Sequence, residues 1–346
     1  MLNRIRRRIV LAILLSFCVI GGARADSDKR VAKVMTVNMD AGTDLGFMLY
    51  FLTTDPMLGA QLTYQELAQS QIPERAGLVA DTIAAEQPYL VSLQEATLWR
   101  TGPTAESATD VLYDQLALLL SALASRGQYY QVAATQNLLD AAVPMSETLA
   151  LRFTDRDVIL VRSDLPQSRL DLSNVRTGRY QATFEFEGIP VPRGWMSVDV
   201  KMRGKQFRFV NTHLETPYPG IPAATEIQVA QADELIGIMA ATDLPVVLAG
   251  DFNANASAGP DQSDATVHIL NTGYQDTWLA AHPGEPGYTW PLFWEDFYAG
   301  SPVLPFERID LIYARGLDIL DVRQTGLSAP WGSDHAGVTA TVEIGH

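Results

Sequence analysis

The chain has 346 residues, of which 47% are hydrophobic and 19% are charged, and its formal net charge at pH 7 is −15. This balance excludes an intrinsically disordered chain, which would hold fewer apolar residues, and a multispan membrane protein, which would hold fewer charged ones. The length supplies a large core, and the chain has no internal repeat or low-complexity linker, so we expect one enzyme-sized domain.

The N-terminus has the order of segments that is typical of a secretory signal peptide. Four arginines within residues 4–8 precede the apolar run Ile9–Ile20, and Ala23-Arg24-Ala25 supplies the small residues of a cleavage site. We therefore predict a signal peptide over residues 1–25 and export of residues 26–346 to the periplasm or the medium. An uncleaved membrane anchor is the alternative, although the apolar run is shorter than the roughly 20 residues that cross a bilayer.

Removal of this segment makes the chain more acidic. Residues 1–25 contain five arginines and no acid, so residues 26–346 hold 20 Lys and Arg against 40 Asp and Glu, a net charge of −20. Such a chain repels polyanions at long range, which weakens the case for a nucleic-acid-binding protein. The single cysteine, Cys18, lies in the predicted signal peptide, so the exported chain has neither a disulfide nor a thiol nucleophile.

Short apolar runs and two alternating segments predict strands, and helical spacing of apolar residues predicts helices. The predicted strands are Val31–Val37, Tyr89–Leu93, Val158–Val161, Ala182–Phe186, Trp195–Val200, Phe207–Val210, Pro245–Ala249 and Ile309–Ala314. The predicted helices are Pro73–Glu86, Asp110–Ser125, Ala223–Ala240 and Thr266–Asn271. This order predicts an α/β (α+β) fold, with mixed sheets and helices outside them.

Two segments look inserted between these elements. Residues Met39–Ile72 contain the dense apolar patch Leu45–Leu52, and residues Gly284–Phe306 carry seven aromatic side chains among Pro and Gly. Each segment could form an apolar rim beside an active site, or a cap that packs on itself. We favour the cap for both.

Polar residues recur at the carboxyl ends of predicted strands, where open sheets place their ligand sites. A single residue of this kind would usually belong to a turn or a cap. Turn chemistry alone does not explain six chain segments that each deliver Asn, Asp, Glu or His. These residues are Asn38, Glu95, His213, Asp251 with Asn253, Asp310, and Asp334 with His335. Their oxygens suit a hard cation such as Mg²⁺, and their imidazoles suit proton transfer.

The same residues stand in motifs that resemble the endonuclease/exonuclease/phosphatase superfamily. The motifs are Asn38, Glu95, Asn-Thr-His-Leu at 211–214, Gly-Asp-Phe-Asn at 250–253, Arg-Ile-Asp at 308–310 and Ser-Asp-His at 333–335. They occur in the order of that superfamily, which includes exonuclease III-type nucleases, pancreatic-type deoxyribonucleases and neutral sphingomyelinases. The chain resembles an exported bacterial member. The resemblance implies a four-layer αββα sandwich, with two mixed β-sheets packed face to face and helices outside.

The resemblance implies a divalent cation as the cofactor, with Mg²⁺ expected and Mn²⁺ as the alternative. Glu95 is implied as the principal metal ligand, with Asn38 beside it. Asp334 is implied to lie near the metal or near a second metal position. The expected activity is therefore that of a metal-dependent phosphoesterase.

Five further residues are implied to be catalytic. Asp251 would orient or deprotonate the attacking water, and Asn253 would hold a phosphate oxygen. His335 would contact the phosphoryl group or act as general base, with Asp310 orienting it. His213 would donate a hydrogen bond to the phosphate. An Asp–His pair of this kind fixes the tautomer of the imidazole and raises its pKa, which agrees with these roles.

The middle of the chain departs from the pattern of the repair nucleases, which carry a Tyr and a further Asp there. Phe153 and Asp157 lie in roughly that region, and we assign a role to neither. Basic residues that are candidates for lining a phosphate pocket, although no motif places them, are Arg176, Arg179, Arg193 and Lys205.

Three substrate classes remain open. The preferred one is a phosphodiester of a phospholipid headgroup, as for a sphingomyelinase, hydrolysed by in-line attack of water with transient contact to a membrane surface. The alternatives are a secreted non-specific nuclease and a small-molecule phosphomonoesterase, and a catalytically inactive binding protein is a minor one. We expect a monomer without an obligate protein partner.

Overall fold

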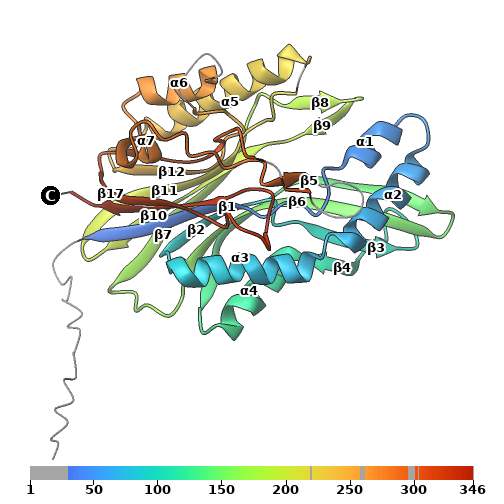
Figure 1. Cartoon of the computed structure of the whole chain (residues 1–346), viewed down its shortest axis with the longest axis horizontal. Helices are drawn as coiled ribbons and strands as arrows, with labels where there is room; N and C mark the ends of the chain where they lie inside the picture. The colour runs from blue at the N-terminus through green and yellow to red at the C-terminus, as the bar shows by residue number, and fades with distance from the viewer. Residues whose placement is uncertain (1–29, 219, 258–261, 295–300, 303, 346) are drawn as a thin grey trace, which may run out of the picture.

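Two mixed β-sheets pack face to face, and helices cover both outer faces (Figure 1). The computed structural model describes residues 30–345 except 219, 258–261, 295–300 and 303, so the predicted signal peptide lies outside the described residues. The predicted four-layer arrangement is confirmed. Within the described part, no helix has the length and apolar character to span a membrane.

The first sheet contains eight strands, and its central pair, β1 and β2, is parallel. In order across the sheet they are β17 (Asp318–Thr325), β18 (Gly337–Glu343), β1 (Val31–Asn38), β2 (Leu90–Gln94), β6 (Leu149–Arg162), β3 (Leu98–Gly102) and β4 (Asp110–Asp114), and β5 (Tyr130–Ser146) also pairs with β6. Helices α3 (Ile72–Glu86) and α4 (Gln115–Ser125) cover its outer face. Helix α3 buries a stripe with helical spacing, formed by Ala76, Val79, Ala80 and Ile83.

The second sheet contains six strands and carries α5 (Pro222–Met239) and α6 (Asp264–Asn271) on its outer face. Its order is β13 (Gln275–Asp276), β16 (Asp310–Arg315), β12 (Val246–Asp251), β11 (Lys205–His213), β10 (Gly194–Met202) and β7 (Leu170–Arg179). Strands β11 and β12 approach each other closely at Gly250. A side chain there would not fit, because its Cβ would lie 2.0 Å from the carbonyl oxygen of Thr212. The remaining elements are α1 (Gly46–Phe51), α2 (Pro56–Gln69), α7 (Thr277–Ala281), and the hairpins β8 (Phe184–Phe186) with β9 (Ile189–Val191) and β14 (Phe293–Trp294) with β15 (Ser301–Pro302).

The space between the two sheets changes from apolar to polar along the strands. Val34, Val198 and Phe209 belong to the apolar part. Toward the ends of β2 and β11, the side chain of Gln94 instead donates to Asn211 Oδ1 at 3.1 Å, and Asn211 donates to the Leu93 carbonyl at 3.0 Å. Burial of these amides is tolerated because they bond to each other and to backbone. The polar end of this layer leads directly to the candidate site.

One predicted helix begins five residues later than expected. Residues Asp110–Asp114 form β4, which pairs with β3, and the helix starts at Gln115. Asp114 caps it, because its side chain accepts a hydrogen bond from the Ala117 backbone N–H at 3.2 Å. The predicted strand Ala182–Phe186 is also shortened to β8, in a small hairpin outside both large sheets.

The two inserted segments combine packing with exposure. Within the first segment, α1 and α2 form, and Leu45 and Met48 pack against a buried cluster, whereas the side chain of Tyr50 is 77% exposed. Within the second segment, Phe293 packs against Trp331, with ring centroids 5.6 Å apart. Phe297 and Tyr298 lie outside the described residues. Both segments therefore act partly as caps, and each leaves an apolar side chain exposed.

Candidate active site

Three neighbouring strands of the second sheet place three polar side chains in one row. His213 on β11 is in register with Asp251 on β12, and Asp251 is in register with Asp310 on β16. Directly paired residues point to the same face of a sheet, and neighbouring strands are only about 4.8 Å apart. The row therefore concentrates two carboxylates and one imidazole, each at most 1% exposed.

The first sheet adds an amide and a carboxylate from across the interface. Asn38 ends β1, and its Nδ2 donates to Glu95 Oε1 and to Asp251 Oδ2, both at 3.0 Å. Glu95 follows β2 in a left-handed conformation with φ of 53°, and its Oε2 accepts the backbone N–H of Ala41 at 2.9 Å. The amide of Asn38 thus links the acids of the two sheets.

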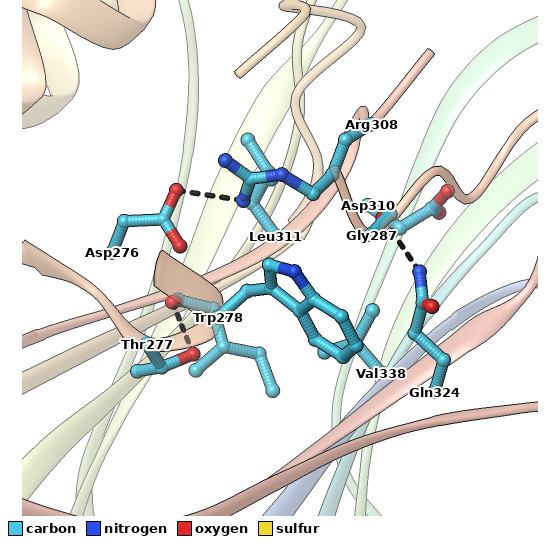
Figure 2. A pocket seen from close by; sticks show the side chains of 10 residues that line it. Asp276, Thr277, Trp278, Gly287, Arg308, Asp310, Leu311, Gln324 and Val338 are labelled. Carbon is cyan, nitrogen blue, oxygen red and sulfur yellow. Dashed lines mark hydrogen bonds and ion pairs between the residues drawn. The ribbon is translucent and has the colours of Figure 1, made fainter. Parts of the chain in front are cut away.

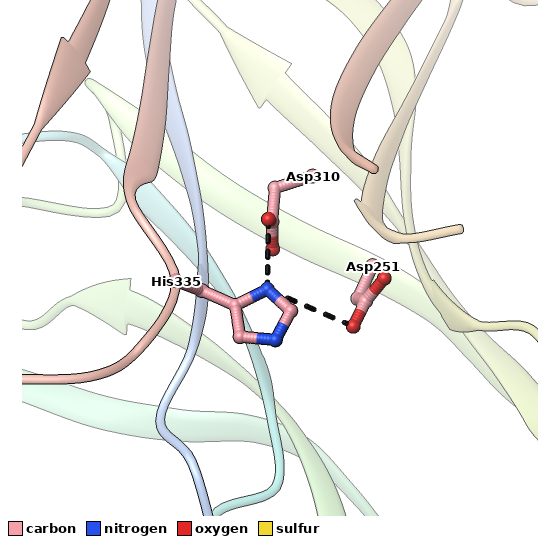
Figure 3. A group of neighbouring side chains, drawn as sticks. All are labelled: Asp251, Asp310 and His335. Carbon is pink, nitrogen blue, oxygen red and sulfur yellow. Dashed lines mark hydrogen bonds and ion pairs between the residues drawn. The ribbon is translucent and has the colours of Figure 1, made fainter. Parts of the chain in front are cut away.

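A loop before β18 delivers the remaining predicted residues, Asp334 and His335. Figure 3 shows the imidazole of His335 between two carboxylates: its Nδ1 lies 2.9 Å from Asp310 Oδ2 and 4.0 Å from Asp251 Oδ2. Its Nε2 lies 3.8 Å from Asp334 Oδ1. Asp251, Asp310 and His335 offer ligand atoms within 4.8 Å of one another, so this group is itself compact enough to hold a cation.

Asn253 acts mainly as a support. It has a left-handed φ of 49°, and its backbone N–H donates to Asp251 Oδ1 at 2.8 Å. Its side-chain Nδ2 donates to the Leu214 carbonyl at 3.0 Å. Gln228 of α5 completes the loop by donating to the backbone carbonyls of Glu215 and Asn253 at 2.8 and 2.7 Å. The expected contact of Asn253 with a phosphate oxygen stays a prediction.

A buried charged group that the sequence analysis did not assign surrounds His213. Arg193 Nη1 lies 3.1 Å from both ring nitrogens of His213, and Arg193 Nη2 lies 3.7 Å from Glu215 Oε1. Asp157 Oδ1 lies 3.9 Å from His213 Nδ1. Asp155 projects from the same strand as Asp157, two residues earlier, and hence to the same side. This group extends the site beyond the predicted residues.

The other unassigned candidates lie elsewhere. Phe153 packs against Trp99, with ring centroids 4.6 Å apart. Arg179 donates to the backbone carbonyls of Asn137 and Leu138, and Arg176 stacks over the ring of Trp195. Lys205 begins β11, at the opposite end of the strand from His213. Of the four basic candidates, Arg193 is the one that reaches the site acids.

The acids of the site repel one another in a partly dehydrated environment. Burial, with the nearby Asp155 carboxylate, raises the pKa of Glu95 to about 7. Burial and the Asp310 carboxylate raise the pKa of Asp251 to about 6, and burial raises that of Asp334 to about 6. Among the described residues, Asp310 Oδ1 and both carboxylate oxygens of Asp157 are buried without a hydrogen-bond partner. The crowding of Glu95, Asp251 and Asp310 and the unpaired oxygen of Asp310 fit a hard divalent cation. Burial raises the pKa of Asp157 well above its usual range, so Asp157 does not add to this negative charge.

The two imidazoles have opposite charge preferences. Burial, Arg193 and His335 lower the pKa of His213 well below its usual range. Because a guanidinium only donates, its contact with His213 needs an unprotonated ring nitrogen, which agrees with a neutral imidazole. Burial also disfavours charge on His335, but the carboxylates of Asp310, Asp334 and Asp251 outweigh it and raise the pKa of His335 well above its usual range.

A small, partly open pocket of about 10 Å³ is lined by Asp310 and its neighbours (Figure 2). It has room for about one water molecule and is far too small for a substrate. Its walls are tied together, because Arg308 Nη1 bonds to Asp276 Oδ2 at 2.7 Å and Gln324 Nε2 donates to the Gly287 carbonyl at 2.6 Å. These contacts hold the start of β16, and with it Asp310, in place.

Comparisons with known proteins agree with this geometry. The profile of the Endonuclease/Exonuclease/phosphatase family matches residues 68–335. A search of curated protein sequences found no match.

Solved structures share the fold at low sequence identity. An endonuclease/exonuclease/phosphatase from Beutenbergia cavernae DSM 12333 is 21% identical, with a TM-score of 0.57 over 92% of this chain and 72% of that chain. A family protein from Leptotrichia buccalis C-1013-b is 17% identical, with a TM-score of 0.57 over 90% of this chain and 99% of that chain.

The human nocturnin catalytic domain, solved with a bound sulfate anion, is 19% identical, with a TM-score of 0.55 over 91% of this chain and 94% of that chain. At these identities the likeness shows the fold, and the family rests on the profile match over most of the chain together with the motifs. The chain therefore belongs to the endonuclease/exonuclease/phosphatase family, whose members are typically hydrolases of phosphoester bonds.

Proposed function

We propose that the chain is a divalent-metal-dependent phosphodiesterase that uses Mg²⁺, with Mn²⁺ as the alternative ion. The observation that carries the proposal is the crowding of buried carboxylates around the Asn38 side chain, which bonds to both Glu95 and Asp251. Burial raises the pKa of both of these acids. Such crowding favours either proton uptake or a bound cation, and at neutral pH a divalent cation stabilises the ionised acids. Glu95 and Asp334 are the residues that would hold it. Asn38, predicted as a further ligand, directs its Nδ2 toward Glu95 and Asp251 and its Oδ1 toward the Asp40 N–H, so in this arrangement it would position Glu95. A bound cation would neutralise phosphoryl charge and lower the pKa of a bound water.

The residues of the chain divide the remaining chemistry between them. Asp251 is fixed by Asn38 and by the backbone N–H of Asn253, so one carboxylate stands ready to orient the attacking water and accept its proton. His335, charged and held by Asp310 at 2.9 Å, is suited to donate to a phosphoryl or leaving-group oxygen. Neutral His213 is suited to donate one further hydrogen bond. Paired groups whose pKa values are driven apart commonly divide acid and base roles in this way.

A phosphodiester is favoured over a monoester because the arginine at the site, Arg193, already pairs with an acidic residue of the protein. Arg193 contacts His213 and pairs with Glu215. Burial raises the pKa of Asp155 and of Asp157, and the charge of Arg193 opposes that rise at both. A monoester dianion would need cations that are not neutralised by acids, whereas a diester carries one charge. A nuclease would need a cationic groove, which a net charge of −15 opposes.

An apolar surface beside the site favours a diester that carries an apolar group, such as a phospholipid headgroup ester. The ring of Trp290 lies 6.2 Å from that of His335, and the ring of Phe306 lies 5.9 Å from that of Trp290. Phe306 is 49% exposed and Leu304 is 88% exposed. This run of apolar side chains leads from the imidazole to solvent and suits transient contact with a lipid surface.

The test is hydrolysis of bis(p-nitrophenyl) phosphate, compared with p-nitrophenyl phosphate, sphingomyelin vesicles and plasmid DNA. We expect the diester to be cleaved with Mg²⁺ or Mn²⁺ and not with EDTA. Glu95→Gln should remove most turnover, whereas Glu74→Gln, at an exposed position of α3, should not. Chelator-resistant cleavage would overturn the metal assignment, and preference for the monoester or DNA would overturn the substrate class. Inactivity on every substrate would support an inactive binding protein.

We also propose that the protein is exported and acts as a monomer without an obligate partner. The support for export is the order of basic, apolar and small residues over 1–25. N-terminal sequencing of the periplasmic or secreted protein should begin at Asp26. Retention of the leader in the membrane fraction would favour the anchor, and light scattering would detect an oligomer.

A further inference from the structure

The indole of Trp290 holds one oxygen of the Asp334 carboxylate. Its Nε1 donates to Asp334 Oδ2 at 2.8 Å. The other oxygen, Oδ1, lies 3.8 Å from His335 Nε2, on the side of the imidazole. A carboxylate has two equivalent oxygens and rotates when nothing distinguishes them. The indole N–H distinguishes the two oxygens, because it bonds to Oδ2 at 2.8 Å, whereas Oδ1 faces the imidazole and has a longer contact of 3.5 Å with the Ser333 hydroxyl.

Backbone hydrogen bonds around Trp290 hold this segment against two parts of the chain, the one that carries Asp310 and the loop that carries Asp334. Thr289 and Trp290 donate to the Glu307 carbonyl at 2.7 and 3.0 Å, and Thr289 Oγ1 accepts the backbone N–H of Asp310 at 3.1 Å. On the other side, the Leu292 N–H donates to the Asp334 carbonyl at 2.7 Å, and the Ala336 N–H donates to the Thr289 carbonyl at 2.8 Å. The segment is therefore bonded both to the chain that carries Asp310 and to the loop that carries Asp334.

We propose that Trp290 is a positioning residue whose indole N–H orients the Asp334 carboxylate for a divalent cation and thereby sets the affinity of the site for that cation. This inference rests on the proposed function only in taking a divalent cation as the ligand of the site. Partners that orient ligating carboxylates from behind typically change metal affinity about 10–100-fold when they are removed. The ring of Trp290 supports the loop by packing, and its N–H supplies the orientation, so the two contributions are separable by substitution.

The experiment uses Trp290→Phe, which keeps an aromatic ring and removes the N–H. The full-length mature protein is melted at increasing Mn²⁺ without substrate, and the Mn²⁺ concentration that gives half of the maximal rise in Tm is measured. We expect this concentration to rise about tenfold in Trp290→Phe. At saturating Mn²⁺, kcat for bis(p-nitrophenyl) phosphate should return close to that of the unsubstituted protein. The matched control is Trp278→Phe, which removes an indole N–H that donates to the Glu285 carbonyl at 3.0 Å.

Asp334→Asn and Glu95→Gln separate this inference from the proposed function. If both abolish the rise in Tm and Trp290→Phe leaves the half-saturating concentration unchanged, the role of Trp290 is wrong and the metal site stands. If neither variant changes the Mn²⁺ response, the metal site itself is wrong. If Trp290→Phe fails to fold, the indole ¹⁵N–¹H resonance of Trp290 in the unsubstituted protein supplies the second measurement. A shift of that resonance, but not that of Trp278, on addition of Mg²⁺ supports the proposal, and its absence overturns it.

Discussion

His213 and His335 are both buried, but the pKa of one imidazole is lowered and that of the other is raised. They are 1% and 9% exposed, and they lie 3.6 and 4.0 Å from the same carboxylate oxygen, Oδ2 of Asp251. The difference comes from their other neighbours: an arginine stands against His213, whereas Asp310 bonds to His335 at 2.9 Å. The pKa of His213 is accordingly lowered and that of His335 raised. Burial alone therefore does not decide the charge of an imidazole, and the partner does.

The largest expected effect on kcat comes from replacing His335, the histidine whose pKa is raised. We expect His335→Asn to lower kcat by about 10⁴-fold and His213→Asn by about 10²-fold, the two ends of the usual range for acid–base and hydrogen-bonding groups. A charged donor stabilises developing negative charge more than a neutral one. The assay is cleavage of bis(p-nitrophenyl) phosphate at saturating Mn²⁺. His268→Asn, whose imidazole is 42% exposed and pairs with Asp233, is the control. Equal losses at the two sites would break the comparison.

The arginine side is expected to matter for stability. Arg193→Met leaves Glu215, 0% exposed, without its cationic partner, and removal of one member of a buried pair costs about 3–5 kcal/mol. Urea unfolding with EDTA present measures this loss in the free energy of unfolding. The matched control is Arg323→Met, which breaks the exposed pair with Asp321 and should cost less than about 1 kcal/mol. A loss at Arg193 no larger than at Arg323 would show that the buried acids do not depend on the arginine.

The residues that could be predicted from the sequence lie where strands end. The end of a predicted strand can be recognised because polar and turn-forming residues follow the apolar run. The motif Gly-Asp-Phe-Asn at 250–253 could therefore be placed at the carboxyl end of a strand, where sheets place their ligand sites. The structure brings the eight predicted residues together from both sheets, and the register of β11, β12 and β16 explains three of them. The expectation of strand carboxyl ends was wrong for Asp310, which begins β16 because that strand runs antiparallel to β12, and for Asp334 and His335, which precede β18. The apolar periods of strands and helices predicted mixed sheets with helices outside them, and the resemblance to the superfamily implied the four-layer arrangement.

The residues that were missed lie inside strands or beside them. Asp155 and Asp157 occupy alternate positions of β6, where a sequence pattern cannot distinguish a solvated face from a polar interior. The signal that was present is the alternation itself: two aspartates two residues apart, next to the apolar run Val158–Val161, share one face. The start of α4 was misplaced for a similar reason, because pairing of Asp110–Asp114 with β3 is a non-local contact.

A smaller effect is expected from pH on the metal-free protein. The pKa values of Glu95 and Asp251, about 7 and about 6, lie above their ordinary values, so the folded state binds these protons more tightly than the unfolded chain. The free energy of unfolding then falls as pH rises from the ordinary carboxyl range toward neutrality. The raised pKa of His335 acts in the same direction, and the lowered pKa of His213 acts against it.

Melting curves in EDTA should therefore show Tm falling between about pH 4.5 and pH 7, because bound protons are lost in that window. Saturating Mg²⁺ should raise Tm more at about pH 8 than at about pH 5.5, since ligands must be deprotonated to bind a cation. Glu95→Gln should flatten the EDTA curve. A larger effect of Mg²⁺ at the lower pH would contradict the assignment of these acids to the cation.

The smallest effect on activity and stability is expected from replacing Asp157, whose carboxyl lies 3.9 Å from the imidazole of His213. Burial, together with the Asp155 carboxylate, raises the pKa of Asp157 well above its usual range, and neither of its oxygens has a hydrogen-bond partner among the described residues. A protonated aspartate and an asparagine carry the same charge and have nearly the same shape. Asp157→Asn should therefore change kcat less than about threefold and the free energy of unfolding by less than about 1 kcal/mol, within the range of a neutral hydrogen bond.

Asp310→Asn is the matched substitution on the other side, because it replaces the acid that bonds to His335 at 2.9 Å. It removes a charge-assisted bond that keeps the imidazole protonated, so a loss of about 10²-fold or more in kcat is expected. If Asp157→Asn lost as much activity as Asp310→Asn, Asp157 would have to be ionised and oriented toward His213. The two histidines would then each depend on a carboxylate, and the difference between the two sides of the site would reduce to Arg193 alone.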